Sequence, residues 1–249
     1  MMLDGGFIQF DATEETRAWA AAARAAAGPV LADPEMRAKW MRHGQTWFVG
    51  VDALPNDDTG AIGGVPFVGP WDGMIPGLPL HPAQVSVIYS GYPIRDERDT
   101  DKEHNYRLKR DAAHLDGLIG EGPQKRRHLR EPHAYILGVA LNDCSACPLV
   151  VWPGSEIIMR EALTVAFAGL PPSMWPDVDL TEIYTDARAE VFECCERVEL
   201  PMSVGQSVLL DRMMIHGTAP EGRCQPPKEG RMIAFFRPIA PDIRAWLRD

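Results

Sequence analysis

The chain has 249 residues, of which 45% are hydrophobic and 24% charged, a composition that allows a globular protein to bury a full core. Its 35 acidic residues outnumber its 25 basic residues, and the formal net charge of −10 disfavours nucleic acid as a partner. No apolar run is long enough to cross a bilayer, and the start, MMLDGGFIQF, lacks the features of a signal peptide, so we expect a cytoplasmic protein without a membrane partner.

The N-terminal region, residues 1–50, is expected to be helical. Its alanine-rich segment, DATEETRAWAAAARAAAG, predicts a helix that begins at Asp11 or Thr13 and ends at Gly28. The segment 34–44, PEMRAKWMRHG, predicts a second and shorter helix that begins with a proline and ends at a glycine.

Residues 54–82 form a long segment that is dense in glycine and proline. Such a segment could cover a binding site as a lid. The composition favours a surface connection that is packed down by Phe67 and Trp71.

The remainder of the sequence predicts short strands. One helical insertion near residues 155–170, SEIIMREALTVAFAGL, interrupts them. We therefore expect a single domain, residues 1–249, that is mainly β with helical decoration, with a double-stranded β-helix (jelly roll, cupin-like) core over 84–238. The expected strands lie in QVSVIYSGY (84–92), HAYILGVAL (133–141), CPLVVWPG (147–154), ARAEVFECCERVEL (187–200), QSVLLDRMMIHG (206–217) and RMIAFFRP (231–238).

A histidine and an aspartate two residues apart, in RDAAHLDGL, suggest part of a metal site. In an extended chain His114 and Asp116 point to the same face, and Leu115 points to the other. His216 ends an apolar strand-like run and is the best candidate for the missing ligand. Two histidines and one carboxylate leave open positions on a metal, which suits non-haem Fe(II) and O₂ chemistry.

Arg231 opens the last apolar strand, and Thr218 follows His216 by two residues. A guanidinium that points inward from a strand can bind a carboxylate through two hydrogen bonds. A threonine hydroxyl can share the same anion. On its own, a solvated cation at the end of a strand would be the simpler interpretation of Arg231.

The segments HLD (114–116), LVVWPGSE (149–156), GQSVLLDRMMIHGTAP (205–220) and RMIAFF (231–236) together resemble the phytanoyl-CoA dioxygenase family. Members of that family are Fe(II)- and 2-oxoglutarate-dependent oxygenases with a double-stranded β-helix core. The resemblance covers about residues 84–238.

The resemblance implies a role for each candidate residue. His114, Asp116 and His216 would hold the iron, and Arg231 and Thr218 would bind the distal carboxylate of 2-oxoglutarate. With O₂, the enzyme would hydroxylate a small or medium-sized organic substrate and release succinate and CO₂. Because relatives that halogenate lack the carboxylate ligand, Asp116 favours hydroxylation. Weaker candidates for the metal-side carboxylate of 2-oxoglutarate are Tyr89 and Gln84 on the preceding strand.

The sequence departs from the family pattern at two places. Glu156 stands where the family's PGSH turn has its histidine, which removes any role that histidine would carry. The insertion CQPPKEG lengthens the interval between His216 and Arg231, and it makes Arg223 a rival for the anion site.

Two other hypotheses remain open from the sequence. A cupin-like metalloprotein, a Zn²⁺ or Mn²⁺ hydrolase or isomerase, would not need an inward cation at Arg231. A metal-free β-sandwich binding module would leave His114, Asp116 and His216 apart in space.

Overall fold

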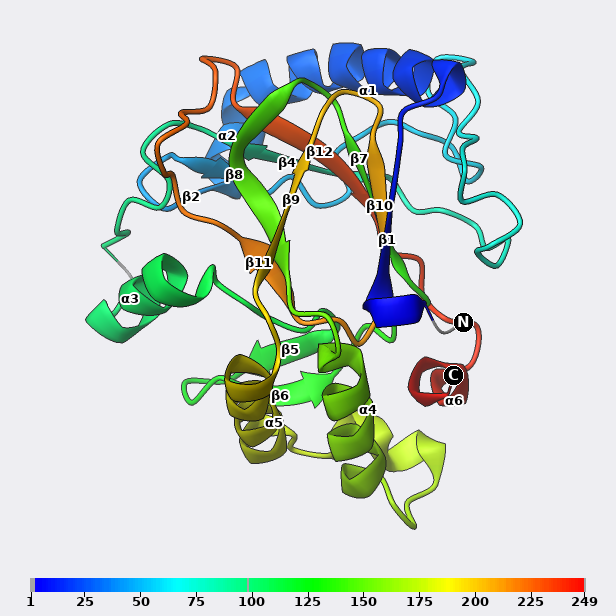
Figure 1. Cartoon of the computed structure of the whole chain (residues 1–249), viewed down its shortest axis with the longest axis vertical. Coiled ribbons are helices and arrows are strands. Elements are labelled where there is room, and N and C mark those ends of the chain that lie inside the picture. Colours follow the sequence, from blue (N-terminus) through cyan, green and yellow to red (C-terminus); the bar gives the residue numbers. More distant parts are fainter. Residues whose placement is uncertain (1–2, 98, 249) are drawn as a thin grey trace.

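The computed structural model describes residues 3–97 and 99–248 and has two facing antiparallel sheets (Figure 1). Within the described residues, a third sheet of two strands, β5 (Leu118–Glu121) and β6 (Arg126–Leu129), forms a hairpin. The three-stranded sheet has the order β11 (His216–Thr218), β8 (Cys144–Val151), β9 (Val198–Met202). The seven-stranded sheet has the order β1 (Phe7–Phe10), β10 (Ser207–Leu210), β7 (Ile136–Ala140), β12 (Arg231–Phe236), β4 (Gln84–Ile88), β3 (Trp47–Phe48), β2 (Met41–Arg42).

The two larger sheets bury an apolar layer between them. Ile136 and Ile233 of the seven-stranded sheet pack in one cluster with Leu149, Val151 and other residues of the three-stranded sheet. Side chains alternate along each strand, so that Ser86 of β4 faces this layer while its neighbours Val85 and Val87 face away. The expected mainly β fold with a jelly-roll core is confirmed.

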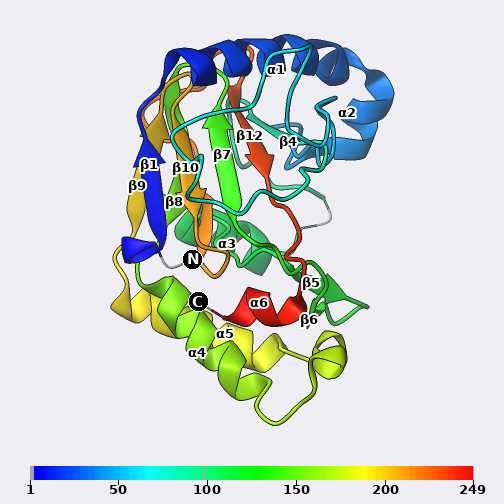
Figure 2. The same ribbon diagram turned by 90° about the vertical axis from the view of Figure 1, so that its right-hand side faces the viewer.

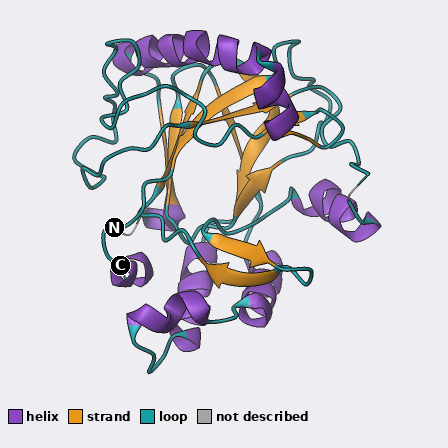
Figure 3. Ribbon diagram, turned by 180° about the vertical axis from the view of Figure 1, so that it is seen from behind, coloured by secondary structure: helices purple, strands orange, loops and turns teal. Residues whose placement is uncertain are grey.

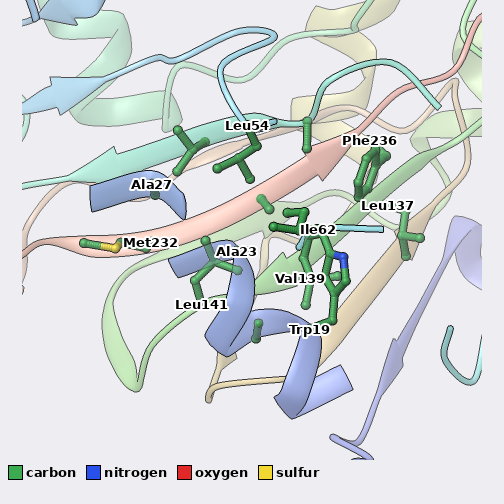
Figure 4. Close-up of a cluster of buried hydrophobic side chains, with 14 of the residues drawn as sticks. Trp19, Ala23, Ala27, Leu54, Ile62, Leu137, Val139, Leu141, Met232 and Phe236 are labelled. Carbon is green, nitrogen blue, oxygen red and sulfur yellow. The ribbon is translucent and has the colours of Figure 1, made fainter. Parts of the chain in front are cut away.

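The outer face of the seven-stranded sheet is covered by helix α1 (Glu14–Ala32) and by residues 54–82 (Figure 2). Trp19, Ala23 and Ala27 of α1 pack against sheet residues such as Val139 (Figure 4). The indole N–H of Trp19 also donates to the carbonyl of Gly60 over 2.8 Å, which joins the two coverings. The segment 54–82 is thus a packed surface connection.

The helix boundaries in this region differ from the prediction. Thr13 and Thr16 form a capping box that starts α1, an arrangement that contributes about 1 kcal/mol. The helix continues through Gly28 to Ala32, because its small residues pack against the sheet. Asp33 then caps α2 (Pro34–Trp40), after which the chain enters β2.

A helical layer lies below the sheets, beside the hairpin (Figure 3). Tyr184 and Val191 of helix α5 pack with Met159 and Leu163 of helix α4. The side chain of Leu115 packs in the same cluster. It therefore points in the opposite direction to the side chains of its neighbours His114 and Asp116. The helices of this layer are α4 (Ser155–Ala166), η2 (Pro172–Asp177), α5 (Thr181–Cys194) and α6 (Ile243–Leu247).

The prediction of a strand over 187–200 was wrong in its first part. Residues up to Cys194 belong to α5, and the strand β9 begins only at Val198. The shorter elements η1 (Asp4–Gly6) and α3 (Asp101–Arg110) complete the described chain. Among its helices, none combines the length and apolar character that crossing a bilayer would require.

Candidate metal centre

His114, Asp116 and His216 converge at one end of the space between the two large sheets. The Nε2 atom of His114 lies 3.2 Å from Oδ1 of Asp116, and Nε2 of His216 lies 3.6 Å from Oδ2. One ligand atom from each side chain lies within 4.8 Å of the others, and no other such group of three occurs across residues 3–97 and 99–248. This convergence contradicts the metal-free module, which required the three residues to lie apart.

Backbone pairing brings the two histidines together. The N–H of His114 donates to the carbonyl of His216 over 2.8 Å, and the reverse bond measures 3.1 Å. The HxD segment is therefore a single bridge at the edge of the three-stranded sheet, followed by a turn at Asp116 and Gly117. The two side chains of the HxD motif still face the same site.

Each imidazole is oriented by a carbonyl of its own segment. Nδ1 of His114 lies 3.0 Å from the carbonyl oxygen of Ala112, and Nδ1 of His216 lies 2.9 Å from that of Met214. Because a carbonyl oxygen only accepts hydrogen bonds, both Nδ1 atoms carry the proton. Both Nε2 lone pairs are thereby left for a metal ion.

Asp116 is buried beside a cation, Arg237. Its Oδ2 accepts a hydrogen bond of 3.1 Å from Nη1 of Arg237. Burial alone would raise the pKa of this carboxyl, but the charge of Arg237 and the adjacent imidazoles of His114 and His216 outweigh burial and hold the pKa well below its ordinary value. The carboxyl of Asp116 is therefore anionic at neutral pH.

The strand β11 is fixed at the position of His216 by two contacts. The Ile215 N–H donates to the Ser155 hydroxyl at the start of α4 over 2.9 Å. The Thr218 N–H donates to the carbonyl of Asp111 over 2.8 Å. Asp111 is held in turn by a bidentate ion pair with Arg197, with distances of 2.7 and 2.8 Å.

The Gly217→Ala substitution tests this anchoring. A Cβ at Gly217 would lie 2.2 Å from the carbonyl oxygen of Asp111, so the HxD segment and β11 must separate. We expect the free energy of unfolding to fall by about 1–3 kcal/mol, with weaker binding of Mn²⁺. Thermal unfolding and Mn²⁺ titration measure both effects. Gly222→Ala is the matched control because a Cβ there meets no atom within 4 Å; equal behaviour of the two variants would refute the anchoring.

The three candidate ligands open onto a cavity of about 160 Å³. Gln84 and Thr218, both expected to bind 2-oxoglutarate, line it. Tyr89 does not: it packs on the outer face of the sheet, where it interacts with Arg37. The parity of β4 explains the difference, because Gln84 and Tyr89 are an odd number of residues apart and so face opposite sides. Tyr89 therefore does not face the candidate ligands.

Arg231 is buried between the sheets but does not line this cavity. Its Nε and Nη1 atoms have no hydrogen-bond partner among the described residues. Burial lowers the pKa of Arg231. The nearby side chains of Cys147, Cys144 and Tyr92 act in the opposite direction, but burial has the larger effect. Leu149 lines both the metal-site cavity and the much smaller space beside Arg231. The rival Arg223 is exposed in the connection between β11 and β12.

Sequence reasoning missed several residues of the cavity, chiefly Arg237, Trp47 and Ser86. The position of Arg237 could have been inferred from the sequence, because it continues the inward-facing alternation that includes Phe235 of β12. The position of Trp47 could not, because the sequence does not reveal that the short strand β3 pairs with β4. Its indole N–H donates to Ser86 Oγ over 3.0 Å.

Glu156, the departure from the family's PGSH turn, lies outside the metal cavity. Its Oε2 accepts a hydrogen bond of 2.9 Å from the backbone N–H of Gly154. Burial raises the pKa of this carboxyl. Glu156 therefore closes the turn before α4 and does not face the candidate ligands.

No family description matches the sequence, and no curated protein matches it. The solved structures that it resembles include three that are each under 20% identical to it. The first is the non-heme α-ketoglutarate-dependent carbocyclase SnoK from nogalamycin biosynthesis, with a TM-score of 0.35 at 15% identity. The similarity covers 63% of this chain and 47% of SnoK, so the chain spans about half of SnoK. The second is AviO1 from Streptomyces viridochromogenes Tue57, with a TM-score of 0.38 at 16% identity over 95% of this chain and 90% of AviO1. The third is EctD from S. alaskensis with bound Fe, with a TM-score of 0.39 at 15% identity over 93% of this chain and 71% of EctD.

Proposed function

We propose that this protein is an Fe(II)- and 2-oxoglutarate-dependent oxygenase, of the phytanoyl-CoA dioxygenase type, that hydroxylates a small or medium-sized organic molecule. The observation that carries the proposal is the convergence of His114, Asp116 and His216 beside a cavity between the sheets. Two imidazoles and one anionic carboxylate form a donor set suited to Fe(II) with positions left open. When bound, the iron would supply the activation of O₂ and of the keto acid.

The buried cation Arg231 fits a dicarboxylate co-substrate. An arginine without an anion is costly to bury, and its Nε and Nη1 atoms, which have no partner in the part of the chain that the structure describes, leave two donors for a carboxylate. In this proposal Arg231 and Thr218 bind the distal carboxylate of 2-oxoglutarate, and Leu149, which lies between the two spaces, shifts to admit it.

The other cavity residues would orient the substrate and exclude water. The apolar wall of the cavity includes Trp47, Val49, Ile136 and Phe235. A volume of 160 Å³ is smaller than a typical pocket for a drug-sized ligand, so the cavity suits a small molecule or one end of a larger one.

Anaerobic titration with Fe(II) and then 2-oxoglutarate tests the proposal. We expect the weak visible charge-transfer band of a keto acid chelated to ferrous iron. The band should be absent from His216→Ala, which lacks one imidazole ligand, and retained in His104→Ala, which removes a histidine outside the site.

The alternative outcome has a defined meaning. Tight binding of Fe(II), Zn²⁺ or Mn²⁺ without the band would reject the oxygenase and favour the cupin-like hydrolase or isomerase. Failure of the wild-type protein to bind any of these ions would reject the metal centre itself.

A further inference from the structure

Arg237 follows strand β12 and holds two groups of the cavity at once. Its Nη1 donates to Oδ2 of Asp116 over 3.1 Å, and its Nη2 donates to Oε1 of Gln84 over 2.6 Å. Both contacts are largely shielded from solvent, since the side chains of Arg237 and Asp116 are 18% and 10% exposed. A planar guanidinium that bonds two fixed acceptors defines the position of both.

The second acceptor, Gln84, is itself fixed. Its side-chain N–H donates to the carbonyl oxygen of Val49 over 2.9 Å, which turns Oε1 towards Arg237. Gln84 is 7% exposed and pairs with Phe235, two residues before Arg237. The side chain of Arg237 is therefore anchored independently of Asp116.

The backbone of Arg237 is held on both sides by histidines. Its N–H donates to Nε2 of His81 over 2.9 Å, and its carbonyl oxygen accepts from Nδ1 of His133 over 2.9 Å. His81 in turn places Nδ1 2.7 Å from the Pro82 carbonyl, which assigns the proton to that nitrogen and leaves Nε2 as an acceptor. Histidines outside the ligand set thus place the arginine.

The consequence lies in the two oxygens of Asp116. Oδ2 accepts from Arg237 and lies 3.6 Å from Nε2 of His216, whereas Oδ1 has no guanidinium partner among residues 3–97 and 99–248 and lies 3.2 Å from Nε2 of His114. We propose that Arg237, anchored by Gln84, is a positioning residue that presents Asp116 to the metal through one oxygen. This inference rests on the metal centre of the proposed function.

Charge provides an independent argument for positioning. A cation beside the carboxylate weakens its direct attraction for a divalent ion, although the same cation keeps the buried carboxyl ionised. Because the direct effect of this charge opposes the metal, the contribution that we assign to Arg237 is orientation of the ligand. Outer-shell partners of this kind typically account for about ten- to a hundredfold in metal affinity.

The test is Mn²⁺ binding in the absence of 2-oxoglutarate, measured by calorimetry and by the electron paramagnetic resonance spectrum of the bound ion. We expect Arg237→Met to weaken binding by about ten- to a hundredfold and to change the spectrum, which reports the symmetry of the ligands. Gln84→Leu keeps the arginine but removes its anchor, and it should produce the same change in weaker form. Arg237→Lys, which cannot bond both partners, should not restore the wild-type spectrum.

Arg24→Met is the matched control, because Arg24 is an exposed arginine that pairs with Glu229 and does not line the cavity. Wild-type affinity and spectrum in Arg237→Met would overturn the inference while leaving the metal centre intact. Loss of 2-oxoglutarate binding alone would also overturn it, by making Arg237 a direct anion-binding residue. If wild-type protein bound no Mn²⁺, the metal centre would be wrong, and Arg237 would have no ligand to position.

Discussion

Asp116→Asn is expected to lower the affinity for Fe(II) by more than about a hundredfold, beyond the loss that an outer-shell partner causes. The amide removes the anionic ligand but keeps the shape of the side chain and an oxygen that can accept from Arg237. Asp116→Ala should lose the metal equally. It should also destabilise the fold, because Arg237 then loses its buried carboxylate partner.

The measurement for Asp116 is anaerobic Fe(II) titration combined with thermal unfolding of the metal-free protein. Asp179→Asn is a suitable control, since Asp179 is a carboxylate paired with Arg126 on the surface. Retention of Fe(II) by the Asp116→Asn protein would refute the assignment of Asp116 as a ligand.

Arg231→Met is expected to weaken 2-oxoglutarate binding by about ten- to a hundredfold or more, because hydrogen bonds to a charged group contribute about 1.5–3 kcal/mol each. Fe(II) binding should stay at the wild-type level, since Arg231 contacts none of the three ligands. The unliganded protein should be as stable as wild type or more stable, because methionine removes a buried cation whose Nε and Nη1 atoms have no hydrogen-bond partner among the described residues.

Two measurements separate binding from stability at Arg231. Titration of the charge-transfer band gives the affinity for 2-oxoglutarate, and calorimetric unfolding with and without the keto acid gives the stabilisation that linkage predicts only for a binding protein. The exposed rival Arg223→Met is the control and should behave like wild type. Unchanged 2-oxoglutarate affinity in Arg231→Met, with loss of stability, would make Arg231 structural.

Much of the fold could be predicted because strands buried on one or two faces leave a local pattern. The segments around β4, β7, β8 and β12 showed that pattern, and the structure has strands there. The error at 187–200 arose because helix α5 buries only one narrow side against α4. Its exposed positions, which include the acidic residue Glu193, gave an alternation that is also typical of a strand.

Residues of the candidate site could be predicted where a local sequence motif indicated them. They could not be predicted where the contact depends on how separate segments pair. The HxD spacing and the histidine before Gly217 could be recognised locally. The role of Arg237 depends on its reach to Asp116 and on the Gln84 anchor, which involve three separate segments. Nothing in the spacing of these residues indicates that they meet, because the contact follows from the register of β12 with β4.

The reciprocal backbone bonds between His114 and His216 make the metal centre a measure of completed assembly. The two segments lie far apart in the sequence, and contacts of high sequence separation close late because of their entropic cost. A fragment that ends before β11 contains only His114 and Asp116 of the three candidate donors. A fragment that begins after the HxD turn contains only His216. Stoichiometric uptake of a metal could therefore serve as a quality assay for refolded or circularly permuted protein, independent of any knowledge of the substrate.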